Sequence, residues 1–188
     1  MPLNGQNMKM NNKTKAMLAG IFILVAYGVL VSGVTSSKIW IMIADVISGL
    51  AVIGIAAIMY PFFKVAGKKI SLSYLLLKIL EGTLMIVAGI LFLNNSSQYF
   101  RDQIYNGIHL YAFISSGFVF YYLLYKTKLV PRYISIWGAI ATLALFTKTV
   151  LSFFGQSFPV LDIMLVLIIT NEIFLAIWLM VKGFNITK

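Results

Sequence analysis

The sequence has no cysteine, one histidine and few charged residues. Without cysteine, disulfides and thiolate metal sites are excluded. Only 11% of the 188 residues are charged while 61% are hydrophobic, and the mean hydropathy is +0.94. A soluble domain of this length needs far more polar surface. The apolar residues come instead in long runs, such as 16–31 and 47–63, and about 20 apolar residues cross a bilayer as a helix. The sequence therefore predicts a polytopic membrane protein.

The apolar runs predict an all-α integral membrane bundle of six transmembrane helices joined by short polar connections. The expected spans are 16–36, 39–63, 71–94, 104–125, 133–154 and 159–181. The domain organisation that follows is a short basic tail at 1–15, a single six-helix transmembrane domain at 16–184 and a C-terminal tail at 185–188.

Lysine and arginine predict the orientation, because positive residues collect in cytoplasmic loops. One side of the predicted bundle carries eleven of them: Lys9, Lys13, Lys15, Lys64, Lys68, Lys69, Lys126, Lys128, Arg132, Lys182 and Lys188. The opposite side carries Lys38 and Arg101. We therefore expect both termini in the cytoplasm and a multi-pass protein of the cell (plasma) membrane. This bias also accounts for the net charge of +10, so the lipid bilayer, and no nucleic acid, is the expected partner.

Seven ionisable residues lie inside the predicted spans, where charge is costly and usually marks function or pairing. At about 1.5 Å of rise per residue they fall into two layers. The outer layer, about 6–10 Å below the outer end of the spans, contains Asp45, His109, Lys148 and Asp162. The deep layer, about 14 Å or more from the inner edge, contains Lys78, Glu81 and Glu172.

Within the deep layer, equal depth makes Lys78 the expected partner of Glu172. Such a pair would pin the third span to the sixth, which is a structural role. The layer holds one cation and two carboxylates, however. Either one of Glu81 and Glu172 holds a proton, or the layer binds a cation, as in a proton- or cation-coupled carrier. A protonated acid that only donates a hydrogen bond fits equally well.

The outer layer predicts a polar cavity that opens to the outer side. Small residues near Asp45, His109 and Lys148 leave space for close helix packing or for a ligand. All seven ionisable residues are therefore candidate ligand-binding residues, with the outer layer at the mouth of the cavity and the deep layer at its floor.

Three function classes remain open at this point. The leading one is binding or transport of a small solute, ion (a proton included) or lipid. The first alternative is an accessory, assembly or immunity-type protein whose buried charges only fix helix register, with a homodimer or a membrane protein as partner. The second is a membrane-embedded enzyme. No catalytic residue, cofactor or metal site is predicted, because the chain has one histidine and no known ligand spacing.

Two segments resemble a known family. They are "YYLLYKTKLVPRYISIWG" and the closing "NEIFLAIWLMVKGF". Together with "HLYAFISSGFVF" and the run after Tyr60, they resemble an uncharacterised prokaryotic family of small polytopic membrane proteins, domain of unknown function 4386. The resemblance runs over about 16–184. It implies a membrane location and an all-α fold, and it transfers no catalytic residues.

Overall fold

The computed structural model of the chain describes the backbone of residues 11–94, 98–156 and 159–185, and the side chains of 11–94, 98–156 and 166–185. Its elements are α1 (Asn12–Ala26), η1 (Tyr27–Gly33), α2 (Lys38–Phe63), η2 (Lys64–Ala66), α3 (Lys68–Leu93), α4 (Gln98–Ile104), η3 (Tyr105–His109), α5 (Leu110–Thr127), α6 (Arg132–Phe153) and α7 (Pro159–Val181).

The long helices form a closed ring, in the order α1, α2, α3, α5, α6 and α7. Each packs against the next, and α7 closes the ring by packing against α1. Among the described residues, five helical segments are long and apolar enough to cross a bilayer, and 166–181 of α7 forms a shorter apolar helix. The predicted all-α membrane bundle of about six helices is confirmed.

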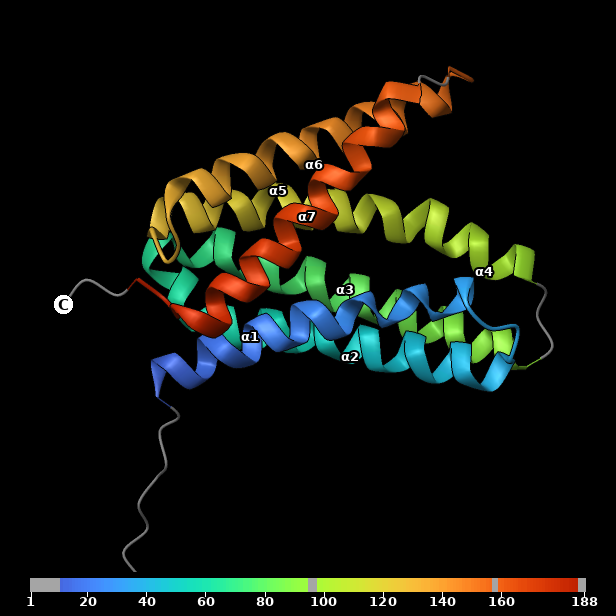
Figure 1. Ribbon diagram of the computed structural model, residues 1–188, viewed down its shortest axis with the longest axis horizontal. Helices are drawn as coiled ribbons and strands as arrows, with labels where there is room; N and C mark the ends of the chain where they lie inside the picture. The colour runs from blue at the N-terminus through green and yellow to red at the C-terminus, as the bar shows by residue number, and fades with distance from the viewer. Residues whose placement is uncertain (1–10, 95–97, 157–158, 186–188) are drawn as a thin grey trace, which may run out of the picture.

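Both described ends of the chain lie at the same end of the bundle (Figure 1). A Cβ on Gly183 would lie 3.9 Å from Lys13 Cγ, and the Asn185 N–H donates to the Leu129 carbonyl at 2.8 Å. An even number of spans requires this arrangement. The assignment of this end to the cytoplasm stays a prediction from the positive residues.

The tightest helix contact joins α2 and α3, which run side by side over their whole length. Gly49 and Gly82 face each other there, and a Cβ on either would collide with the carbonyl oxygen of the other. Small residues that let two backbones approach are a common device in membrane bundles, where lipid gives helices no hydrophobic reason to associate.

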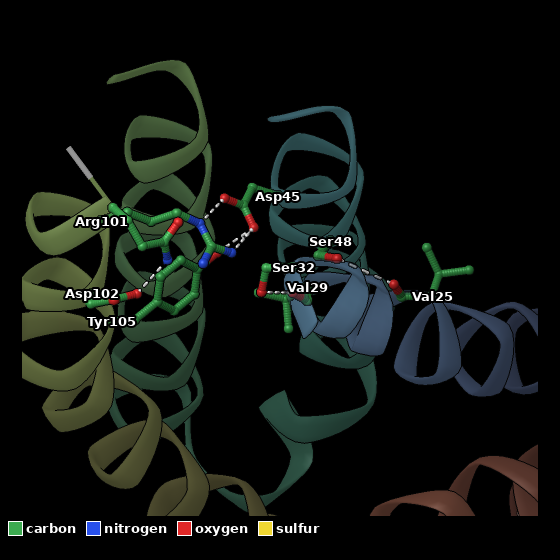
Figure 2. Close-up of polar contacts among 9 residues, drawn as sticks. Val25, Val29, Ser32, Asp45, Ser48, Arg101, Asp102 and Tyr105 are labelled. Carbon is green, nitrogen blue, oxygen red and sulfur yellow. Dashed lines mark hydrogen bonds and ion pairs between the residues drawn. The ribbon is translucent and has the colours of Figure 1, made fainter. Parts of the chain in front are cut away.

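The first span narrows from an α-helix to a 3₁₀ helix at Tyr27. At this transition the Ser48 hydroxyl of α2 donates to the Val25 carbonyl at 3.4 Å (Figure 2). A side chain that inserts into the ladder of backbone hydrogen bonds is a recognised cause of such irregularity. The 3₁₀ segment, which begins at Tyr27, forms the outer part of the first span.

The fourth span also departs from a regular helix. Its short first part, α4, passes through the π-helical turn η3 before α5 begins. Gly107 in that turn has non-helical dihedral angles, φ −101° and ψ −113°. Single π-turns inside helices are frequent at functional sites, and this one carries Tyr105 and His109.

Candidate functional site

The outer end of the bundle holds a closed ion-pair cluster (Figure 2). Arg101 of α4 bonds both carboxylate oxygens of Asp45, with Nε 2.8 Å from Oδ2 and Nη2 2.7 Å from Oδ1. The Tyr105 hydroxyl donates to Oδ1 at 2.9 Å. The Asp45 side chain is fully buried and Arg101 is 4% exposed. A bidentate arginine and a phenol satisfy this carboxylate, so the cluster fastens α4 and η3 to α2.

Two adjoining cavities lie in the interior of the ring. The inner cavity has a volume of about 60 Å³ and the outer one about 280 Å³. Both are lined by α1, α2, α3, α5 and α7, and they share five lining residues: Ala26, Val52, Glu81, Phe113 and Glu172. We call this pair of spaces the central cavity. All three residues of the predicted deep layer line it.

The Lys78 ammonium is held within its own helix. Its Nζ lies 3.0 Å from Glu81 Oε1 and 5.4 Å from the centroid of the Phe113 ring. The other oxygen of Glu81, Oε2, accepts a hydrogen bond from the Ser116 hydroxyl at 2.7 Å. Glu81 is 2% exposed, and both of its oxygens are therefore satisfied.

Glu172 has a different partner from the predicted one. Its Oε2 accepts a hydrogen bond from the Tyr27 hydroxyl at 2.8 Å. The predicted ion pair between Lys78 and Glu172 is wrong, because Glu81 lies one helical turn from Lys78 on the same face of α3 and takes the ammonium. Lys78 and Glu172 nevertheless line the same inner cavity.

The inner cavity also carries polar groups that no prediction singled out. The side chains of Tyr74 and Tyr121 line it and are 0% and 1% exposed. Neither hydroxyl has a hydrogen-bond partner among the described residues. Buried hydroxyls are nearly always hydrogen-bonded, to protein, water or ligand. These two hydroxyls are exceptions among the described residues, and the Tyr121 ring lies against Gly138 of α6.

The predicted outer layer is divided between separate places. Asp45 is sealed by Arg101, and His109 lines the outer cavity together with Glu81 and Glu172. Lys148 lines another cavity, of about 460 Å³, between α5 and α6. The side chain of Asp162 lies outside the described residues. The prediction that one space collects the outer layer is wrong for Asp45 and Lys148, because residues at one depth on different helices can face different neighbours.

Sequence reasoning missed the partners of the buried carboxylates. Arg101 was counted as a loop residue, and Tyr27 as part of an apolar run. A signal existed for the first: Arg101 is one of only two positive residues on the outer side, and Asp45 is a carboxylate in the outer half of its span that requires a cation. For Tyr27 the signal was depth alone, since it lies as far into the first span as Glu172 lies into the last.

Comparison with known proteins supports the resemblance. Residues 95–183 match the model of a family described as domain of unknown function (DUF4386). No curated protein and no solved structure matches the chain. The matched part runs from the start of the fourth span through α7, and so includes Arg101, His109 and Glu172. The resemblance of this chain to the DUF4386 family is thereby confirmed, over residues 95–183.

Proposed function

We propose that the protein binds a small solute in the central cavity and acts as a carrier or receptor for it in the cell membrane. One observation carries this proposal: two carboxylates, Glu81 and Glu172, line one cavity in which Lys78 is the one lysine among the described residues, and Lys78 is bonded to Glu81. Glu172 is left without a cation bonded to it among the described residues. A carboxylate in that position binds a proton or a cationic group.

The size of the cavity limits the solute. Sites for small molecules measure roughly 300–1,000 Å³, and the outer cavity of about 280 Å³ lies just below that range. The solute is therefore smaller than a typical drug. The outer cavity is lined by residues nearer the outer ends of their spans than Glu172 is, namely Val29, His109 and Ile168. This position favours access from the outer side.

The ion pair of the deep layer does not join two helices. Lys78 and Glu81 are three residues apart on one helix, so their bond does not set the register of a helix pair. The Glu81–Ser116 and Tyr27–Glu172 hydrogen bonds do join helices, but a hydroxyl can bond a neutral acceptor as well, so these contacts do not require a charge. Among the described residues, the ion pair that joins two helices is Asp45–Arg101.

The test uses the absence of native cysteine. A single cysteine replaces Val29, a half-buried residue that lines the outer cavity. In proteoliposomes, methyl methanethiosulfonate, a small neutral reagent, should label Val29→Cys. An added Ala26→Leu substitution should slow that labelling, because Ala26 borders both cavities.

The matched control is Ala57→Leu, which adds the same side chain to an exposed position of α2. It should leave the labelling rate unchanged. If methyl methanethiosulfonate does not label Val29→Cys in the otherwise unchanged chain, the cavity does not admit small solutes. The function as an accessory, assembly or immunity-type protein then replaces the proposal.

A further inference from the structure

We propose that the central cavity selects small organic ammonium ions, with Glu172 as their counterion. This inference rests on the proposed function and names its class of solute. It follows from the hydrogen bonds that the two carboxylates in the cavity already accept, from the apolar character of the remaining lining, and from the size of the inner cavity.

The carboxylate oxygens leave one acceptor for a ligand. Glu81 Oε1 is bonded to Lys78, and Glu81 Oε2 to Ser116. Glu172 Oε2 accepts from Tyr27. Among the described residues, Glu172 Oε1 receives no hydrogen bond, and the Glu172 side chain is only half-buried. A donor group that enters the cavity meets this oxygen.

The rest of the outer cavity is hydrocarbon and aromatic. Beside Tyr27, Glu81, His109 and Glu172, its lining consists of Ala26, Val29, Val52, Met85, Leu110, Phe113, Leu145, Ile168 and Ile169. An inorganic cation would have to exchange its hydration shell for these groups, whereas hard cations such as Ca²⁺ require six to eight oxygen ligands. An organic cation instead places its charge at Glu172 and buries its apolar part against the lining.

The protein already holds an ammonium by the same means. Lys78 Nζ contacts a carboxylate at 3.0 Å and lies 5.4 Å from the centroid of the Phe113 ring. Attraction between a cation and the face of an aromatic ring strengthens when the cation is desolvated. Phe113 lines both parts of the central cavity, so a ligand ammonium beside Glu172 finds comparable surroundings.

The inner cavity limits the size of the charged end. A primary ammonium has three N–H donors, and one carboxylate oxygen satisfies only one of them. The inner cavity, about 60 Å³ in volume, accommodates the ammonium group itself or a water molecule that satisfies a second donor.

The experiment compares two charged reagents on the Val29→Cys variant in proteoliposomes. One is trimethylammonioethyl methanethiosulfonate and the other is sulfonatoethyl methanethiosulfonate. Each rate is divided by the rate measured on Val34→Cys, a residue of the same type that is 86% exposed and so reports intrinsic reactivity. A carboxylate-lined cleft concentrates counterions by a factor of about ten or more, so the cationic reagent should gain about tenfold.

Glu172→Gln should abolish that preference, because it removes the charge and keeps the shape. Asp102→Asn is the matched control. It neutralises a carboxylate that bonds Gln98 on α4, outside the cavity, and it should leave the preference intact. If Glu172→Gln does not fold, the chain with an intact Glu172 supplies the answer: benzylammonium chloride should slow labelling of Val29→Cys, and benzyl alcohol should not.

Each outcome decides between the two proposals. Equal corrected rates, or faster reaction of the sulfonate, overturn the ammonium class while leaving solute binding in place. A charge preference that survives Glu172→Gln overturns the role of Glu172. Labelling by methyl methanethiosulfonate but by neither charged reagent also overturns the inference. Failure of all three reagents overturns the proposed function itself.

Discussion

Two carboxylates inside this bundle, Asp45 and Glu172, differ in how many hydrogen bonds they accept from the described residues. Asp45 accepts three hydrogen bonds, two from Arg101 and one from Tyr105, and it is fully buried. Glu172 accepts one, from Tyr27, and lines an open space. A carboxylate whose oxygens are all hydrogen-bonded to the protein fixes the elements that it joins. A carboxylate in a cavity with a free oxygen can still bind a ligand, so we expect function at Glu172 rather than at Asp45.

Removing Arg101 is the most direct test of the contrast between Asp45 and Glu172. Arg101→Ala would leave the Asp45 charge buried without its cation, and breaking a buried pair costs about 3–5 kcal/mol. We expect this to be the largest loss in the free energy of unfolding among the variants considered, measured by titration with sodium dodecyl sulfate in detergent micelles.

Two controls accompany that measurement. Arg132→Ala removes the same side chain at an exposed position and should change stability by only about 0.5 kcal/mol. The double variant Asp45→Leu, Arg101→Met should recover most of the loss, since an apolar pair of similar volume leaves no charge uncompensated. A cost for Arg101→Ala no greater than that of Arg132→Ala would show that the outer cluster does not hold the bundle together.

A second variant tests the same carboxylate through its packing. A Cβ on Gly89 would lie 2.7 Å from Asp45 Cβ, so Gly89→Ala pushes Asp45 away from Arg101. Overpacking of this kind costs about 1–3 kcal/mol. At Gly33 an added Cβ meets nothing within 4 Å, and Gly33→Ala is the control.

The loss caused by Gly89→Ala should shrink when Asp45 is already glycine, because glycine has no Cβ for the new methyl group to meet and residues in contact are not additive. A loss of equal size in both backgrounds would place the strain elsewhere in the contact between α2 and α3.

Substitutions in the central cavity should lower the free energy of unfolding less than substitutions in the outer cluster. Tyr27→Phe removes only the hydroxyl that donates to Glu172, and a typical hydrogen bond contributes about 1 kcal/mol. Tyr105→Phe is the matched change in the outer cluster, where Arg101 still bonds Asp45. Both variants are measured by the same titration. If Tyr27→Phe costs as much as Arg101→Ala, the hydrogen bond to Glu172 is a structural support and the contrast between the two carboxylates disappears.

Sequence alone predicted the bundle because hydropathy and run length are properties of each segment by itself. The predicted spans match the helices to within four residues, except that the fourth begins with α4 at Gln98, six residues before its predicted start. Helix α3 begins at Lys68, three residues early, because lysine stems cover apolar surface while their ammonium groups reach water. The hydropathy pattern did not predict the π-helical turn that contains Gly107.

The candidate site was only partly predictable, for a geometric reason. Counting residues gives the depth of a side chain in the membrane, and the three deep residues do share one cavity. It does not give the direction in which each helix faces. Lys78 therefore bonds Glu81 rather than Glu172, and Lys148 lines a cavity between α5 and α6 that His109 does not line. Of the five acidic residues in the chain, four lie within predicted spans, and depth arithmetic alone did not pair them.

The smallest expected effect on stability belongs to Glu172→Gln. Glutamine keeps the shape of the side chain, and its carbonyl oxygen can still accept the Tyr27 hydroxyl. Removing the charge also spares the cost of burying it, so we expect a change within about 0.5 kcal/mol. Asp45→Asn is the corresponding change in the outer cluster, and it should cost several times more because Arg101 then has no counterion. The two variants should also separate in the labelling experiment, where Glu172→Gln loses the preference for the cationic reagent at full stability. Comparable destabilisation by the two amides would mean that Glu172 is as firmly built into the bundle as Asp45, and its charge would then serve the fold rather than a ligand.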